Sequence, residues 1–269
     1  MIEYLFCDLD ETLIRRYNNG TSGINKYNIQ AIKKLERKGI KLVITTARSP
    51  FFLNRLTGTE YNFDYIAWNG SEIYCGGKLI YSSYINKKAL KDFLSDYPEF
   101  IKYLRVTYND GNTVFGDIKG NAYRLFGTID KKHSDFNKII KKSFIDYSTD
   151  SEVPLFHLVL DNEEMTDFYY KIVSTSRYKE YFTFGRTSDI TIDVTSINCN
   201  KGKAISNYLN RVRKENAEFA VIGDSDNDIS MLDRTKYSFC MLNGTKNALK
   251  HSNYHVKNVA ECINNIISL

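Results

Sequence analysis

Short apolar runs alternate with longer amphipathic stretches in the first part of the chain. Residues 4–7, 41–45 and 65–67 are apolar runs typical of buried strands, and each is followed by polar residues. Between the first two runs, apolar residues recur at helical spacing over residues 29–35, and Gly39 stands where such a helix would end. This alternation predicts an α/β fold built on a doubly wound, Rossmann-like parallel sheet.

The middle of the chain follows a different pattern. Residues 103–108 alternate between apolar and polar side chains, and residues 109–112 (Asn-Asp-Gly-Asn) are a strong turn signal. Near the C-terminus the earlier alternation of helix and strand patterns returns. We therefore predict a discontinuous core domain, residues 1–81 and 188–269, with an α+β domain inserted at residues 82–187.

Composition and charge narrow the possible functions. The chain has 269 residues, of which 42% are hydrophobic and 26% charged, as in ordinary globular proteins. Its net charge is only +5, and the densest basic stretch, residues 131–142, is expected to be a solvated helix face rather than a nucleic-acid patch. The five cysteines show no CxxC spacing, and no apolar run reaches the roughly 20 residues of a membrane span. We expect a cytoplasmic protein that binds neither nucleic acid nor membranes.

Two acidic clusters follow predicted strands. Asp8 and Asp10 come directly after the first strand, at the sheet edge where α/β proteins bind ligands. Residues 224–228 (Asp-Ser-Asp-Asn-Asp) carry three carboxylates, which repel one another unless a cation lies among them. A calcium loop would need Glu where Thr235 stands, so Mg²⁺ suits this cluster better, with a solvated acidic loop as the alternative.

Two residues between these clusters could bind a phosphate. Thr46 follows the second strand and offers a hydroxyl donor, and Lys201 opens a helix and offers a compact positive charge. Each residue alone is more often structural, since a Thr at a helix entrance is usually a cap. The order of the whole set along the chain is what indicates phosphate chemistry.

The ordered motifs DxDxT, strand-end Thr, Lys before a helix and GDxxND resemble those of the haloacid dehalogenase-like superfamily. The long segment between the second and third motifs is similar to that of its Cof-type branch, which contains sugar and metabolite phosphatases with an inserted C2-type cap. Asn69-Gly70 and residues 241–244 (Met-Leu-Asn-Gly) match further positions of that branch. The resemblance implies a magnesium-dependent phosphatase of small phosphorylated metabolites, with a cap that closes over the site and selects the leaving group.

The resemblance also implies roles for the matching residues. Asp8 would attack phosphorus and form an aspartyl-phosphate, while Asp10 would protonate the leaving oxygen and then activate water. Thr46 and Lys201 would hold the transferring phosphoryl group. The residues implied near the phosphate or substrate are Asn69, Asn227 and Arg48. The implied metal ligands are Asp8, Asp10 through its backbone carbonyl, Asp224, and Asp228 through water or by positioning Lys201.

Some questions stay open at this level. Glu11 and Ala47 stand where many relatives have Gly, although neither departure removes a reacting group. A phosphomutase-type transferase and a catalytically silent module that binds a phosphorylated ligand remain as alternatives. The chain is expected to be a monomer or a homodimer. Tyrosines and His157 of the inserted domain are candidates for substrate contact, but most are expected to be packing residues, and none is assigned to the site.

Overall fold

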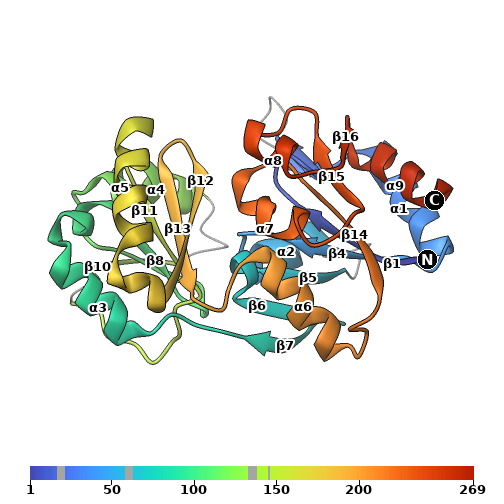
Figure 1. Ribbon diagram of the computed structural model, residues 1–269. Helices are drawn as coiled ribbons and strands as arrows, with labels where there is room; N and C mark the ends of the chain where they lie inside the picture. The colour runs from blue at the N-terminus through green and yellow to red at the C-terminus, as the bar shows by residue number, and fades with distance from the viewer. Residues whose placement is uncertain (17–21, 58–62, 133–137, 145) are drawn as a thin grey trace. The chain divides into compact units, whose positions relative to one another are not determined.

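The computed structural model describes residues 1–16, 22–57, 63–132, 138–144 and 146–269, which form two compact units (Figure 1). The first unit comprises Met1–Arg48, Leu53–Ser82 and Asn200–Leu269, and the second comprises Ser49–Phe52 and Ser83–Cys199. Each unit has its own sheet and its own hydrophobic core. None of the helices in the described ranges is both long and apolar enough to cross a bilayer.

The first unit is built on an eight-stranded sheet. Its spatial order is β16 (Tyr254–Val256), β15 (Ser238–Met241), β14 (Glu218–Gly223), β1 (Ile2–Asp8), β4 (Lys41–Thr45), β5 (Asp64–Ala67), β6 (Glu72–Cys75) and β7 (Lys78–Ser82). The strands from β16 to β5 run parallel, so their carboxyl ends meet at one edge. The predicted α/β fold is confirmed, but the antiparallel hairpin β6–β7 was not foreseen.

Helices cover both faces of this sheet (Figure 1). On one face, Tyr4 and Phe6 of β1 pack against Tyr208 of helix α6 (Lys201–Arg211). Their neighbours in β1 point the other way, because side chains alternate along a strand. Helices α1 (Lys26–Arg37) and α9 (Val259–Ser268) pack against each other, and they contact β4 and β14 respectively.

The remaining elements of this unit are short. They are the antiparallel pair β2 (Ile14–Arg16) and β3 (Ser22–Ile24), helices α7 (Ile229–Leu232) and α8 (Lys246–Lys250), the part of helix α2 (Pro50–Thr57) from Leu53 onward, and the 3₁₀ turns η1 (Trp68–Gly70) and η4 (Asp226–Asp228). Helix α2 begins at Pro50, as the Ser49-Pro50 pair predicts. Turns η1 and η4 follow β5 and β14, which brings both to the carboxyl edge of the sheet.

The second unit contains a six-stranded sheet flanked by helices. The strand order is β10 (Lys138–Ser143), β9 (Asn112–Phe115), β8 (Leu104–Thr107), β11 (Leu155–Val159), β13 (Thr191–Ser196) and β12 (Phe182–Ser188). Its helical elements are α3 (Lys87–Asp96), η2 (Pro98–Tyr103), α4 (Asn121–Lys132), α5 (Glu163–Thr175) and η3 (Arg177–Glu180). All neighbouring strands run antiparallel except β9 and β10.

The two faces of the second sheet differ. One face carries the main core, in which Phe93 of α3 packs against Phe156 of β11 and Phe182 of β12. On the other face, Ala122 of α4 belongs to a small cluster with Phe115 of β9. The remaining positions on that face are largely polar.

Two sequence-based predictions for this region need correction. The return to the first unit occurs at Asn200 rather than at residue 188, because β13 pairs with both β11 and β12 and so belongs to the second sheet. The basic stretch at residues 131–142 is not one helix: α4 ends at Lys132, and Lys138–Ser143 forms the edge strand β10 beside β9. Strand β10 contains two isoleucines and pairs with β9. Pairing with a neighbouring strand decides its conformation here, rather than the local sequence pattern that suggested a helix.

Candidate active site

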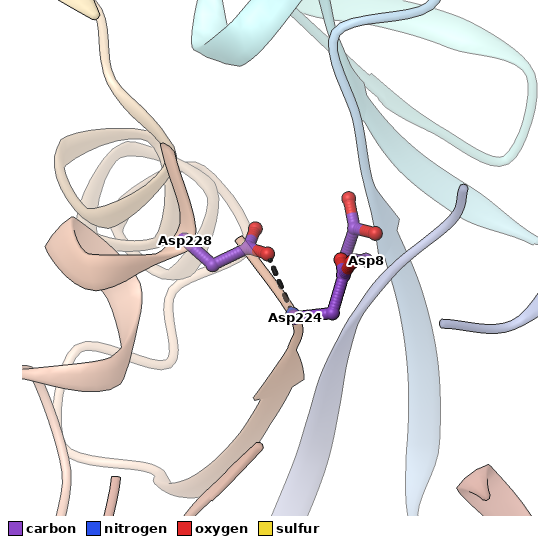
Figure 2. Close-up of side chains that lie close together, drawn as sticks. All are labelled: Asp8, Asp224 and Asp228. Atoms are coloured by element: carbon purple, nitrogen blue, oxygen red, sulfur yellow. Dashed lines mark hydrogen bonds between the residues drawn. The ribbon is translucent and has the colours of Figure 1, made fainter. Parts of the chain in front are cut away.

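The carboxyl edge of the parallel sheet carries a cluster of three aspartates, Asp8, Asp224 and Asp228 (Figure 2). Asp8 is the last residue of β1, and Asp224 follows the end of neighbouring β14. One carboxylate oxygen from each of the three aspartates lies within 4.8 Å of the other two. The parallel pairing of β1 with β14 thus brings together the two acidic clusters that are far apart in the sequence.

Lys201 connects two of these carboxylates. Its Nζ donates hydrogen bonds to Asp8 Oδ1 at 2.6 Å and to Asp228 Oδ1 at 2.5 Å. The exposed fraction is 1% for Lys201, 5% for Asp8 and 0% for Asp228, so the ion pairs are screened little by water. Although burial acts against the charged form, the two carboxylates raise the pKa of Lys201, which holds it as an ammonium.

Asp228 is held by the loop that contains it. Its Oδ2 accepts hydrogen bonds from the backbone N–H of Asp224 at 2.9 Å and of Ser225 at 3.0 Å, and the first is drawn in Figure 2. Gly223 makes this approach possible, because a Cβ there would lie 2.5 Å from the Asp228 carboxylate. Both oxygens of Asp228 are therefore engaged by protein donors.

The aspartates carry more negative charge than Lys201 neutralises. Burial raises the pKa of Asp8 well above its usual range, with Asp228 and Asp224 adding to the shift and Lys201 opposing it. Burial, followed by the charge of Asp228, raises the pKa of Asp224 to about 6, against the opposing effects of Lys201 and a hydrogen bond from Thr12. A hard divalent cation would relieve this repulsion. The all-oxygen donor set of Asp8 and Asp224 fits Mg²⁺.

Asp10 is bound by Arg48 at the same edge. Arg48 Nε donates to Asp10 Oδ2 at 3.0 Å, and Arg48 Nη2 donates to Asp10 Oδ1 at 2.8 Å. This bidentate pair is half-exposed, with side-chain exposures of 36% and 40%. The next residue, Glu11, has φ = 59°, a left-handed conformation that is costly for a residue with a side chain.

The polar residues after β4 and β5 form a second group. Thr46 is buried and its hydroxyl accepts a hydrogen bond from the backbone N–H of Arg48 at 3.1 Å. Its carbonyl accepts from the backbone N–H of Asn69 at 2.9 Å, and Asn69 has φ = 53°. Asn227 Nδ2 donates to Asn69 Oδ1 at 3.4 Å, so turns η1 and η4 are in contact. The backbone around Thr46 thus positions Asn69 beside Asn227.

The structure groups the sequence-predicted residues in a definite way. Asp8, Lys201, Asp224 and Asp228 share one connected set of contacts, Asp10 pairs with Arg48, and Thr46, Asn69 and Asn227 are linked through turn η1. Two contributors had no assigned role in the sequence analysis. Thr12 donates to Asp224 Oδ1 at 3.2 Å, and Asn200 caps α6 by accepting from Lys203 N at 2.7 Å. The sequence does carry a signal for each of them: Thr12 is the Thr of the DxDxT motif, and Asn200 is an Asn directly before a predicted helix, where a capping residue is expected.

Comparison with known proteins agrees with this arrangement. Residues 5–265 match the sequence model of a family described as haloacid dehalogenase-like hydrolases. A Mycoplasma pneumoniae protein named as a candidate phosphatase is 28% identical over 251 residues, covering 86% of this chain and 82% of that one. The 5-amino-6-(5-phospho-D-ribitylamino)uracil phosphatase YcsE of Bacillus subtilis is 24% identical, covering 86% and 80%. The structure of BT1666, a phosphatase of Bacteroides thetaiotaomicron, is similar in fold, with a TM-score of 0.79 at 19% identity and coverage of 100% and 96%.

Proposed function

The chain belongs to the Cof-type haloacid dehalogenase-like hydrolases and is a phosphatase, and on this premise we propose that it hydrolyses small phosphorylated metabolites with Asp8 as the nucleophile and Mg²⁺ as the cofactor. The observation that carries the proposal is the buried ammonium of Lys201 between Asp8 and Asp228. A carboxylate that attacks a phosphate dianion meets strong repulsion, and a fixed positive charge beside it lowers that repulsion.

The proposed reaction has two steps. An Asp8 oxygen forms a bond to phosphorus as the bond to the leaving oxygen breaks, and Asp10 gives that oxygen a proton. Water then attacks phosphorus and loses a proton to Asp10, which releases phosphate and restores Asp8. Both carboxylate oxygens of Asp10 accept a hydrogen bond from the Arg48 guanidinium, so Arg48 holds the carboxylate that would transfer the proton.

We assign the metal to the oxygens of Asp8 and Asp224, together with the Asp10 backbone carbonyl that the family resemblance implies. Bound Mg²⁺ would neutralise charge on the phosphoryl oxygens and on Asp8. Asp228 would act indirectly, since its oxygens accept from Lys201 and from backbone amides.

The remaining site residues would bind the phosphoryl group and the substrate. Thr46, Asn69 and Asn227 offer a hydroxyl and two amides near the sheet edge, and Lys201 offers a charge.

The second unit, residues 83–199, is proposed to be a cap domain that selects the leaving group, since it is an insertion with its own sheet and core. The relative YcsE, whose name specifies a phosphorylated ribityl chain, suggests sugar or alditol phosphates as the substrate class. Five cysteines without disulfides favour the cytoplasm.

Replacing the nucleophile tests this proposal. Asp8→Asn should lower kcat for magnesium-dependent release of phosphate from p-nitrophenyl phosphate by at least about a thousandfold, because an amide does not attack phosphorus. Asp64→Asn is the matched control: Asp64 is also a buried aspartate of this sheet, but it pairs with Tyr208 and Lys41. Phosphate release that survives Asp8→Asn would overturn the Asp8 mechanism, and isomerised sugar phosphate without phosphate release would indicate a mutase.

A further inference from the structure

The segment after β15 lies beside the loop that contains Asp224. Strands β14 and β15 are parallel neighbours, with Gly223 directly beside Cys240, so the segments that follow them leave the sheet at the same edge. The segment after β15 includes residues 241–244 (Met-Leu-Asn-Gly), which have no role in the proposed reaction. Helix α8 comes next and contacts turn η4 and helix α7 (Figure 1).

The carboxylate of Asp226 binds the start of α8. Its Oδ1 accepts a hydrogen bond from the Thr245 hydroxyl at 2.6 Å, and its Oδ2 accepts one from Asn247 Nδ2 at 3.1 Å. The other two aspartates of this loop, Asp224 and Asp228, belong to the cluster with Asp8 instead. Asp226 therefore uses both of its oxygens to connect the acidic loop to α8.

Thr245 holds the acidic loop at two points. Its backbone N–H donates to the carbonyl oxygen of Asp224 at 2.8 Å, and its hydroxyl donates to Asp226. The same hydroxyl accepts from the backbone N–H of Ala248 at 3.2 Å, which caps α8. Because a hydroxyl can donate and accept at once, these bonds are compatible. We call the side chains of Thr245, Asp226 and Asn247 the α8 clasp.

The peptide groups on both sides of Asp224 are fixed. The N–H of Asp224 donates to Asp228 Oδ2 at 2.9 Å, and its carbonyl accepts from Thr245. The direction of a side chain follows from the orientation of the two peptide groups that flank its Cα, and the rotamers open to it depend on the same backbone angles. Holding both groups therefore directs the Asp224 carboxylate, whose Oδ1 also accepts from Thr12 at 3.2 Å.

Gly244 allows the close approach of the two segments. A Cβ at this position would lie 2.7 Å from the carbonyl oxygen of Asp224 and 2.8 Å from Cys240 Sγ. The φ angle of Gly244 is not in the left-handed region, so the close approach and not the backbone conformation requires glycine. The residue after it, Thr245, is thereby brought within hydrogen-bonding distance of Asp224.

From these contacts we propose that the α8 clasp positions Asp224 as a ligand of Mg²⁺ and thereby sets the affinity of the site for the ion. The inference rests on the proposed function, which assigns Asp224 to the metal. The clasp residues are positioning residues, because they act through the backbone of Asp224. Groups that orient metal ligands typically contribute about 10–100-fold to metal affinity, and the exposure of Thr245 and Asn247 to water places the clasp at the lower end.

A helix cap alone would not explain the whole arrangement. The need to cap α8 accounts for the bond from Ala248 to Thr245, but not for the bond from Asn247 to Asp226 or for the glycine at position 244. The two explanations also differ in what they predict. Loss of a cap lowers the stability of the protein, whereas loss of a positioning residue also weakens metal binding.

The test measures Mg²⁺ binding to the full-length protein without substrate, by titration calorimetry with MgCl₂ at pH 8. Thr245→Val removes the hydroxyl at nearly constant volume and should raise the Kd for Mg²⁺ about tenfold. Thr245→Ser keeps the hydroxyl and should stay within about twofold of the wild type. Gly244→Ala places a Cβ against the Asp224 carbonyl and should raise the Kd at least about tenfold as well.

Two variants are matched controls. Asn258→Ala removes a comparable cap from α9, where Asn258 accepts from the backbone N–H of Glu261. Without magnesium, it should lower the urea midpoint about as much as Thr245→Val does. Gly23→Ala adds a Cβ where no atom lies within 4 Å. Because neither residue shares a partner with Asp224, both controls should change the Kd for Mg²⁺ less than about twofold.

The outcomes separate the inference from the proposed function. An unchanged Kd in Thr245→Val, alongside a lower urea midpoint, would refute the inference, as would a Kd in Thr245→Ser as high as in Thr245→Val. If Thr245→Val fails to fold, Asn247→Ala decides, since it removes a bond to Asp226 and leaves the cap in place, and it should raise the Kd at least about threefold. A wild-type protein that does not bind Mg²⁺ would instead overturn the metal assignment of the proposed function, and the inference with it.

Discussion

Lys201 is the residue on which the charge balance at the sheet edge depends. Its ammonium is fully buried and bonded to Asp8 and Asp228, and burial raises the pKa of Asp8 well above its usual range. Removing one member of such a buried ionic group leaves the others uncompensated and typically costs about 3–5 kcal/mol. The same lysine thus supports the fold locally and holds the proposed nucleophile in place.

The raised pKa of Asp224 predicts how the proposed binding of magnesium depends on pH. A carboxyl group whose pKa is about 6 carries a proton below that pH, and a metal ion must displace it. The affinity for Mg²⁺ should therefore fall as the pH is lowered through 6, by up to about tenfold per unit for this group, and the raised pKa of Asp8 acts in the same direction. Magnesium titration calorimetry between pH 5 and 8 measures this. Asp226→Asn in the same loop should keep the dependence, and a flat profile would contradict it.

Glu11 predicts a stabilising substitution beside the site. Its φ of 59° is unfavourable for a residue with a Cβ by roughly 1–2 kcal/mol but is open to glycine. Because glycine also makes the unfolded chain more flexible, Glu11→Gly should raise the free energy of unfolding by a net amount of about 0.5–1 kcal/mol, measured by urea denaturation. Glu11→Ala keeps the Cβ and should give no such gain. Equal stability of the two variants would show that the backbone relaxes.

At the scale of elements, asparagines begin most of the longer helices. The N-cap residues Asn25, Asn86, Asn162, Asn200 and Asn258 each accept a hydrogen bond from a backbone N–H in the first turn. This satisfies donors that the helix itself leaves unpaired. For α6 the cap has a second effect, because Lys201 is the first residue of the helix and its direction depends on how that turn is held.

The cap of α6 can be compared with the equivalent cap of α9. Asn200→Ala and Asn258→Ala should each lower the free energy of unfolding by about 1 kcal/mol, since each removes one capping hydrogen bond. Asn200→Ala alone should also lower kcat several-fold, because it loosens the turn that contains Lys201. Steady-state kinetics together with chemical denaturation separate the two effects. Identical kcat values for the two variants would mean that Lys201 is held by its carboxylates alone.

The elements also show which features could be predicted from the sequence. Buried parallel strands such as β1 are recognisable because both faces are covered, and the positions of Asp8 and Asp224 follow once those strands are neighbours. The hairpin β6–β7 was missed although its two-residue turn, Gly76-Gly77, in which both glycines have positive φ, is a recognised hairpin signal. The Arg48–Asp10 pair is a contact between residues from two strand ends, and no local pattern encodes it. The predicted end of the inserted domain at residue 187 was also wrong, because it depends on β13 pairing with β11, and no local pattern encodes which strands pair.

At the scale of the whole molecule, each unit has a main core of its own among the described residues. The core of the first unit centres on Phe6 and Tyr208, and that of the second on Phe93, which stacks on Phe100 at 5.5 Å and meets Tyr178 edge-on at 5.2 Å. Units with their own cores often unfold as separate cooperative transitions.

This division predicts the thermal behaviour of the protein. Differential scanning calorimetry should resolve two transitions, and Phe93→Ala should destabilise one of them by about 3–5 kcal/mol while leaving the other nearly unchanged. The complementary variant Leu209→Ala, in the core of the first unit, should shift the other transition. A single transition that moves as a whole in both variants would show that the two units unfold together.

The pairing of β1 with β14 has a consequence for biosynthesis. Asp8 is synthesised 193 positions before its partner Lys201, and β14 is made later still. Until then, a nascent chain that has already formed β1 and β4 presents an unpaired edge on the strand that ends at Asp8. At about 5–20 residues per second this stage lasts on the order of ten seconds or more, during which the chain is both inactive and open to wrong pairing. Chaperone binding during translation would therefore be most useful between the synthesis of β4 and that of β14.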